Sequence, residues 1–115
     1  MVYLLTYDGY MKEEKLQEIC PSAILFMQCD LKDCALEFRR FYETAMPTLE
    51  VGDEIVPAVI WKIEETDLQN MELIYPNEIY EREVWNFRTE KDVLKVTVFL
   101  MRETPFAFPK EKEVE

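Results

Sequence analysis

The order of its strand-like and helix-like segments is the feature that most constrains how this chain can fold. Six segments are short, apolar and rich in β-branched or aromatic residues, and two carry apolar residues at helical spacing. Strands that follow one another without a helix between them pair mostly antiparallel. We therefore expect an α+β fold with mostly antiparallel strands that are curled or closed against two helices. The expected strands are Val2 to Thr6, Ala23 to Leu31, Cys34 to Arg39, Ile55 to Ile63, Ile79 to Phe87 and Val93 to Met101. The expected helices run from Met11 to Cys20 and from Glu64 to about Glu72 or Ile74.

Local signals mark the expected ends of these segments. Pro21 ends the first helix, because the residue before a proline is pushed out of the α region. Lys32-Asp33 is a polar break between two strands, and Gly52-Asp53 predicts a turn. Pro57 lies inside an expected strand and predicts a sheet edge or a bulge there. The segment from Glu43 to Glu50 has no clear pattern.

The length of 115 residues suits one domain with one core. We expect this domain to cover residues 1–109, followed by a charged tail from Lys110 to Glu115 that frays. The apolar stretch Phe106-Ala107-Phe108, just before the tail, either contacts a partner or a second copy, or covers the end of the barrel. A monomer and a homodimer are both compatible with the sequence.

Charge and composition exclude several classes of function. Asp and Glu number 24 against 13 Lys and Arg, a net charge of -11 that disfavours nucleic acid and anionic membranes. The absence of histidine removes the usual zinc sites and the usual neutral-pH base, so we expect no metal and no cofactor. Cys20, Cys29 and Cys34 form no CxxC pair and are read as reduced thiols of a cytoplasmic protein. Any chemistry therefore rests on carboxylates.

One carboxylate stands out in the second expected helix. Leu68, Met71, Glu72 and Tyr75 fall at i, i+3, i+4 and i+7, which is one face of an α-helix. Because three of the four are apolar, this face should turn inward and take Glu72 with it. Burial would raise the pKa of its carboxyl group toward neutrality and make it a competent general base or acid. The alternative is that Glu72 lies at a frayed helix boundary.

The loop after the first strand is a second candidate. Tyr7-Asp8-Gly9-Tyr10-Met11 joins a strand to a helix through a tight glycine turn. Such turns expose backbone N–H groups in front of a helix start, which is a general anion site. Many ordinary β-to-α connections share this pattern, so the loop alone does not identify a function.

These two features occur together, in this order, in the gamma-glutamylcyclotransferase-like (AIG2-like) family. The sequence resembles this family over most of its length, from about Val2 to Met101, and the resemblance implies a small mixed, mostly antiparallel β-barrel flanked by two or more helices. Val2 to Met11 is similar to the family's opening strand and its Tyr-Gly-Ser-Asn-Met loop. Glu64 to Glu72 is similar to the family pattern D-L-x-x-L-D-x-x-E-G, and Ile79-Tyr80-Glu81-Arg82 is similar to x-Y-x-R. The other matching segments are Leu36-Glu37-Phe38 and Gly52 to Ile63.

The resemblance implies an activity and a set of site residues. Members of the family cyclise a γ-glutamyl compound: a conserved glutamate takes a proton from the α-amine, which attacks the γ-carbonyl and releases 5-oxoproline. Carried onto this sequence, Glu72 matches the catalytic glutamate when the alignment is anchored at Leu68. The substrate-binding residues would be Tyr7, Asp8, Gly9, Tyr10, Met11 and Tyr80. Anchoring at Tyr80 instead places Leu73 or Ile74 there and leaves no base.

Departures from the family pattern keep a second reading open. Asp8 stands where the family loop has glycine, so it adds a side chain and a negative charge beside the substrate. Leu73 stands after the matched glutamate, and Pro57 replaces a mid-strand glycine. The sequence is thus compatible either with a cyclotransferase that takes an altered γ-glutamyl substrate or with a catalytically inactive relative that acts as a small-molecule-binding or protein-interaction module.

Overall fold

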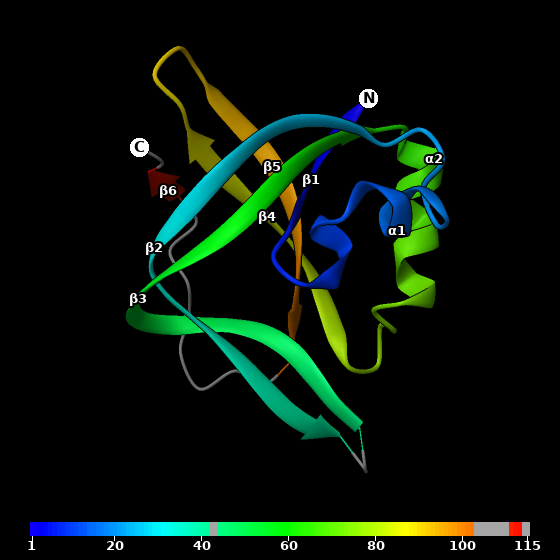
Figure 1. Ribbon diagram of the computed structural model, residues 1–115, viewed down its shortest axis with the longest axis vertical. Coiled ribbons are helices and arrows are strands. Elements are labelled where there is room, and N and C mark those ends of the chain that lie inside the picture. Colours follow the sequence, from blue (N-terminus) through cyan, green and yellow to red (C-terminus); the bar gives the residue numbers. More distant parts are fainter. Residues whose placement is uncertain (42–43, 103–110, 114–115) are drawn as a thin grey trace.

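The computed structural model describes residues 1–41, 44–102 and 111–113 (Figure 1). Ten elements follow one another along these residues. They are β1 (Val2–Thr6), η1 (Gly9–Met11), α1 (Glu13–Gln17), β2 (Ile24–Phe41), β3 (Thr44–Ile63), α2 (Glu65–Leu68), η2 (Gln69–Leu73), β4 (Tyr80–Arg88), β5 (Val93–Met101) and β6 (Glu111–Glu113), where η marks a 3-10 helix.

The strands form one sheet in the order β2-β3-β1-β5-β4-β6. Three neighbouring pairs are antiparallel, β2 with β3, β3 with β1 and β5 with β4, while β1 pairs with β5 and β4 with β6 in parallel. The predicted mixed, mostly antiparallel α+β class is therefore confirmed.

The predicted closure into a barrel is wrong, because β2 and β6 remain at opposite edges of the sheet. The long β2–β3 hairpin explains this outcome. β1 accompanies β3 only from Val59 to Ile63, whereas the hairpin continues away from the sheet to Phe41 and Thr44. Its outer half extends downward in Figure 1. Pro57 lies beyond the last residue paired with β1, as its missing N–H predicts.

A bulge replaces the two expected interruptions of this hairpin. Asp33 adopts a positive φ of 59°, and Cys34 pairs with both Val51 and Glu54. Gly52 lies at the same place, where a Cβ atom would come within 2.7 Å of the Cβ of Ala35. The polar break and the glycine therefore bend two continuous strands instead of ending them.

The later strands agree with expectation, and the helices are shorter than expected. β5 has the predicted bounds and β4 differs from its predicted range by one residue at each end. The first helical segment divides into η1 and α1, and the second into α2 and η2. In the charged tail, residues 111–113 form β6 beside β4, so the expected fraying does not hold for them. The stretch Phe106-Ala107-Phe108 lies outside the described residues.

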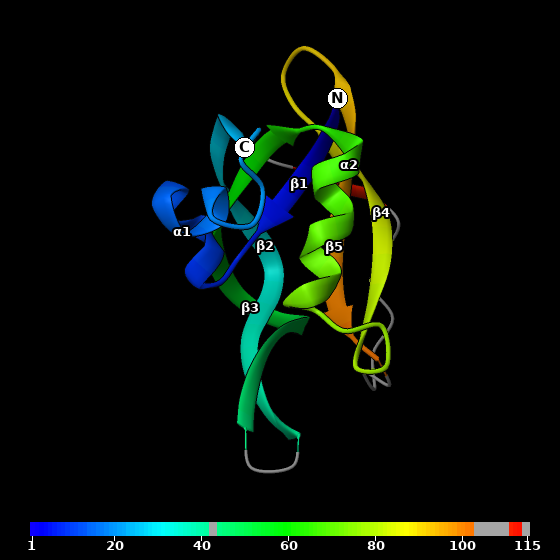
Figure 2. The same ribbon diagram turned by 90° about the vertical axis from the view of Figure 1, so that its right-hand side faces the viewer.

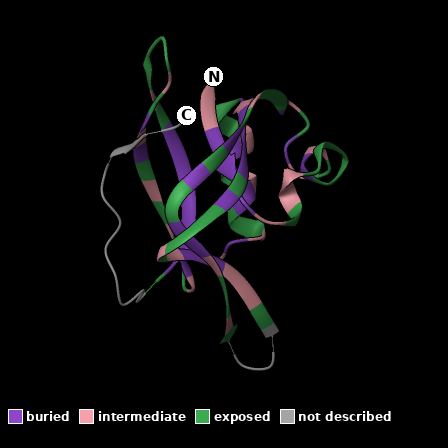
Figure 3. Cartoon of the chain, turned by 60° about the vertical axis from the view of Figure 1, so that its left-hand side comes forward, coloured by how far each residue is buried: buried purple, intermediate pink, exposed green. Residues whose placement is uncertain are grey.

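The middle of the sheet is buried on both faces, whereas β2, β3 and β4 also carry exposed residues (Figure 3). On one face the curled sheet closes over an apolar cluster that includes Leu31, Trp85 and Val98. On the other face α1, α2 and η2 cover a second cluster that includes Leu16 and Met71. Figure 2 shows the second helical segment lying along the sheet over β1 and β5. β1 and β5 are consequently apolar on both faces over most of their length, with Thr6, Lys95 and Thr97 as the exceptions.

Ser22 fixes the start of the second helical segment. Its hydroxyl accepts a hydrogen bond from the Glu64 backbone N–H at 2.9 Å, and both its backbone N–H and its hydroxyl donate to the Asp67 carboxylate. These donated bonds lower the pKa of Asp67. The loop before β2 is thereby tied to the helix that leads to the candidate site. In the part of the chain that the structure describes, no helix combines the length and apolar character needed to cross a membrane.

Candidate functional site

A cavity of about 780 Å³ opens between the loop after β1, the outer half of the β2–β3 hairpin and the end of η2. It brings together segments that are far apart in the sequence. Its lining residues are Tyr7, Asp8, Gly9, Tyr10, Met11, Lys12, Lys15, Leu36, Phe38, Ala45, Met46, Pro47, Ile74, Tyr75 and Tyr80. The six residues predicted to bind substrate, Tyr7 to Met11 and Tyr80, all lie on this cavity, so the structure places them together.

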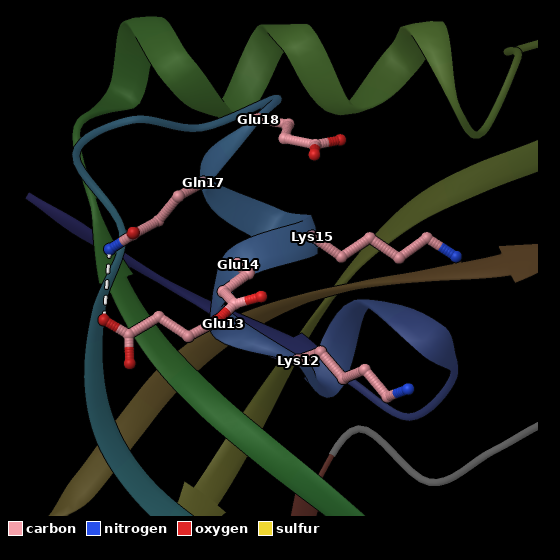
Figure 4. Close-up of a pocket in the computed structure, with 6 residues that line it drawn as sticks. All are labelled: Lys12, Glu13, Glu14, Lys15, Gln17 and Glu18. Atoms are coloured by element: carbon pink, nitrogen blue, oxygen red, sulfur yellow. Dashed lines mark hydrogen bonds between the residues drawn. The ribbon is translucent and has the colours of Figure 1, made fainter.

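The cavity is distinct from the surface hollow along α1 that Figure 4 shows. Every residue of that hollow belongs to the short segment from Lys12 to Glu18, and Gln17 Nε2 there donates to Glu13 Oε1 at 3.2 Å. A hollow built by one helical segment offers a ligand a single wall. The cavity beside it is lined by residues from several elements, which is typical of small-molecule sites.

Asp8 is the one acidic residue among the described residues that line the cavity. Its Oδ1 accepts a hydrogen bond from the Tyr10 backbone N–H at 3.0 Å, which caps η1. Its Oδ2 accepts a hydrogen bond from the phenol of Tyr75. Asp8 thus connects the opening loop to the end of the second helical segment, across 67 residues of sequence.

Tyrosine rings form the inner part of the cavity. The Tyr75 ring lies 4.8 Å from that of Tyr80 and 6.2 Å from that of Tyr10, measured between centroids. The Tyr7 hydroxyl donates to the Phe99 carbonyl at 2.6 Å, and the Tyr80 hydroxyl donates to the Pro47 carbonyl at 2.6 Å. Both hydroxyl groups are therefore directed at the protein's own backbone.

These phenols remain protonated at neutral pH. Burial is the largest cause that raises the pKa of Tyr7, Tyr75 and Tyr80, and the negative charge of Asp8 adds to it in each case. For Tyr75 the hydrogen bond to Asp8 raises the pKa further, because it favours the neutral phenol. The aromatic wall is consequently uncharged, and Asp8 supplies the negative charge of the cavity.

Two lysines bring positive charge to the same cavity. Lys12 and Lys15 both line it, and Figure 4 shows the side chains of Lys12, just before α1, and of Lys15, within α1, extending in the same direction. The Lys15 ammonium lies 4.5 Å from the centroid of the Tyr10 ring, a cation–π contact. It also approaches Gly9, where a Cβ atom would lie 2.9 Å from Lys15 Nζ.

The expectation that Glu72 turns inward is wrong. Its side chain is 55% exposed, it does not line the cavity, and its Oε1 lies 3.5 Å from the Arg82 guanidinium on the surface. The cause is the helix type: from Gln69 onward the segment is a 3-10 helix, in which residues three apart share a face. Leu68, Met71 and Ile74 then face the protein, and Glu72 faces solvent.

Tyr75 is the most informative of the cavity residues that were not predicted from the sequence. The signal was present in the family pattern D-L-x-x-L-D-x-x-E-G. When the pattern is continued from Asp67-Leu68 through Met71, its glutamate falls on Tyr75. Position 75 therefore bears a phenol, and the nearby carboxylate is on Asp8, where the pattern has glycine. Among the described residues, no group of three His, Cys, Asp or Glu side chains is arranged to hold a metal ion.

Comparison with solved structures identifies the fold. Over 98% of this chain and 69% of the other, the structure matches a gamma-glutamyl cyclotransferase with a TM-score of 0.73 and 17% sequence identity. A second match is an uncharacterized protein from Homo sapiens, with a TM-score of 0.75 and 18% identity over 89% of this chain and 67% of that one. No protein family and no curated protein matches the sequence itself. At this identity the likeness shows the fold, and the chain has the gamma-glutamylcyclotransferase-like fold that its sequence pattern indicated.

Proposed function

We propose that this protein binds a small γ-glutamyl amide or amine in the cavity and cyclises it to 5-oxoproline. The observation that supports the proposal best is the cavity itself, since all six predicted binding residues line it. The shared fold with a gamma-glutamyl cyclotransferase adds to it. Fold alone does not determine activity, so the proposal depends on the chemistry that the cavity offers.

The reaction is an intramolecular transfer of an acyl group. A base takes a proton from the α-ammonium group, and the resulting amine attacks the γ-carbonyl carbon to form a new C–N bond. The tetrahedral intermediate then breaks the original C–N bond, and the leaving nitrogen takes up the protons that the ring nitrogen and the base give up. Holding the amine near the carbonyl supplies much of the acceleration, because both groups belong to one bound molecule.

The base is the part of this proposal that the sequence assigned to Glu72. That assignment stays a prediction, and the exposed position of Glu72 beside Arg82 gives it no support. A competent base must lie within hydrogen-bond reach of the proton that it abstracts. Glu72 would have to act from outside the described lining of the cavity.

The second candidate function is a binding module without catalysis. It is favoured by the end of η2, where Ile74 and Tyr75 contribute apolar and phenolic surface to the cavity instead of a carboxylate. In this alternative the cavity holds a γ-glutamyl-type or other small ligand without turning it over. One fold commonly includes both enzymes and proteins without catalytic activity.

The deciding experiment measures 5-oxoproline release from a panel of γ-glutamyl amino acids and γ-glutamyl amines. Release by the wild-type protein supports the cyclotransferase. Binding detected by calorimetry without release supports the binding module. Glu72→Gln is run in parallel, and its loss of release in a folded protein would restore Glu72 as the base.

A further inference from the structure

Asp8 is the carboxylate that faces the cavity, and it is held from two directions. The Tyr10 backbone N–H bonds to one of its oxygens at 3.0 Å, and the Tyr75 phenol bonds to the other. A carboxylate oxygen has two lone pairs, so each oxygen keeps a free acceptor position after these bonds. Asp8 is half-buried, so its orientation is fixed while it stays accessible from the cavity.

The surroundings of Asp8 suit a cation. Tyr7, Tyr10, Tyr75 and Tyr80 all line the same cavity, and aromatic rings attract cations through their faces. The contact of the Lys15 ammonium with Tyr10, at 4.5 Å from the ring centroid, shows that this wall accommodates an ammonium group. Because Tyr7, Tyr75 and Tyr80 keep their protons, Asp8 is left as the negative partner for an incoming cation.

We propose that Asp8 receives the primary ammonium group of the ligand and, in the cyclisation proposed above, accepts its proton. Only the second half of this statement rests on the proposed function. The proton would pass from the ammonium nitrogen to the Asp8 carboxylate, and the neutral amine would form the C–N bond to the γ-carbonyl carbon. The attacking nitrogen would then give up a second proton, and the leaving nitrogen would take up both that proton and the one held by Asp8 as its C–N bond breaks.

Tyr75 acts as a positioning residue in this arrangement. Its phenol holds Asp8 Oδ2, and its ring stacks on Phe99 at 5.2 Å between centroids. Lys12 and Lys15 are the other charged groups among the described residues that line the cavity, and they would meet the carboxylate of the same ligand. The ligand class that fits is therefore a zwitterionic amino acid derivative with a free primary amine.

The test compares γ-glutamylalanine with its N-acetylated form, which lacks the ammonium group, by calorimetric titration. A charge-assisted hydrogen bond is roughly twice as strong as a neutral one, so we expect wild-type protein to prefer the free amine by at least about tenfold. Asp8→Asn should lose this preference and bind both compounds alike. Asp8→Glu, which keeps a carboxylate, should recover part of it.

Glu65→Gln is the matched control, because it removes an exposed carboxylate that does not line the cavity and should keep the full preference. Tyr75→Phe should reduce the preference for the free amine, a readout that a purely structural role would not change. A preference that persists in Asp8→Asn, or wild-type protein that binds both compounds equally, overturns the inference. Urea unfolding verifies that each variant is folded.

The same samples separate the two proposals. Binding of the free amine through Asp8 without 5-oxoproline release rejects the cyclotransferase and keeps the ammonium site. Release that is lost in Glu72→Gln but kept in Asp8→Asn supports the cyclotransferase and rejects Asp8 as its base. Wild-type protein that binds neither compound rejects both.

Discussion

The indole N–H of Trp61 donates a hydrogen bond to the hydroxyl of Thr6 at 2.9 Å, between two strands that pair in the centre of the sheet. Thr6 in turn lies 3.4 Å from the Val59 carbonyl, to which its hydroxyl donates. Both side chains are almost fully buried, with exposed fractions of 2% for Thr6 and 1% for Trp61. The hydroxyl therefore satisfies a buried donor that has no access to water.

Thr6→Val should destabilise the protein by about 1–3 kcal/mol, because it keeps the shape of the side chain and leaves the Trp61 N–H buried without its acceptor. Urea unfolding followed by circular dichroism measures the change. In a Trp61→Phe background the same substitution should cost less, since the donor is already gone. Equal costs in the two backgrounds would mean that the hydrogen bond contributes nothing measurable.

Gly52→Ala should also destabilise the protein, by about 1–3 kcal/mol, because overpacking forces neighbouring atoms to move. The added Cβ atom would meet the Cβ of Ala35 at 2.7 Å and the Ala35 backbone nitrogen at 3.3 Å. Removing the opposing methyl group in the double variant Gly52→Ala/Ala35→Gly should recover part of the loss. Without any recovery, the close approach of the two strands would not be the cause.

Gly9→Ala is the matched control for this prediction. Its Cβ atom would meet the Lys15 ammonium at 2.9 Å, and the end of a flexible lysine side chain can move away. Neither glycine has a positive φ, so backbone strain does not distinguish the two sites. We expect a change in unfolding free energy below about 0.5 kcal/mol for Gly9→Ala, as for ordinary surface substitutions.

Stability should fall as the pH rises above about 10, where tyrosines in the unfolded chain begin to lose their protons. Burial raises the pKa of Tyr7, Tyr75 and Tyr80, so the folded protein holds these protons more tightly than the unfolded chain does. The stabilisation is complete below the unfolded pKa and is lost at higher pH. Each such tyrosine contributes a slope of up to about 1.4 kcal/mol per pH unit.

Tyr75→Phe isolates one part of this pH dependence. Urea unfolding at several alkaline pH values gives the slope of the unfolding free energy against pH for wild type and variant. We expect the two slopes to differ by the amount that corresponds to the release of close to one proton on unfolding. The thiols of Cys20 and Cys29 also titrate in this range, with their pKa raised by burial to about 11 and about 12. Because wild type and variant both contain these thiols, the thiol contributions to the two slopes are equal and cancel when the slopes are subtracted. Parallel slopes would show that Tyr75 does not keep its proton more tightly in the folded state.

The parts of the fold that sequence predicts well are those whose pattern is local. Val93–Met101 is a mostly apolar segment next to a turn, interrupted only by Lys95 and Thr97, and its strand has the predicted bounds. The β2–β3 hairpin could not be predicted in the same way. Lys32-Asp33 and Gly52 look like turn signals by themselves, but pairing between the two strands turns them into one bulge. Local signals of this kind are overridden by partners that lie far away in the sequence.

The candidate site shows the same difference between features that depend on local sequence and features that depend on contacts between distant residues. The opening loop, Tyr7 to Met11, is contiguous, and all five of its residues line the cavity, while their binding of a substrate stays a prediction. The assignment of an inward orientation to Glu72 assumed 3.6 residues per turn, whereas the segment tightens to a 3-10 helix. The Asp8–Tyr75 hydrogen bond joins residues 67 positions apart, and neither residue carries a local signal for it.

The last prediction concerns the three thiols, whose reactivity reports how often local unfolding exposes buried cysteines to solvent. Cys20, Cys29 and Cys34 are all buried, and the Cys20 thiol donates to the Asp67 carbonyl at 3.2 Å. Burial raises the pKa of Cys20 to about 11, so at pH 8 its thiolate fraction is roughly one in a thousand.

Alkylation with iodoacetamide at pH 8 should therefore leave the folded protein unmodified on a timescale that labels a free thiol completely. Mass spectrometry should detect three labels once urea unfolds the chain, matching its three cysteines. Labelling that begins at urea concentrations below the global transition would reveal local opening, and the order in which the cysteines react would locate it. Rapid labelling of Cys20 in the absence of urea would instead show that the contact between the loop before β2 and α2 opens in the native protein.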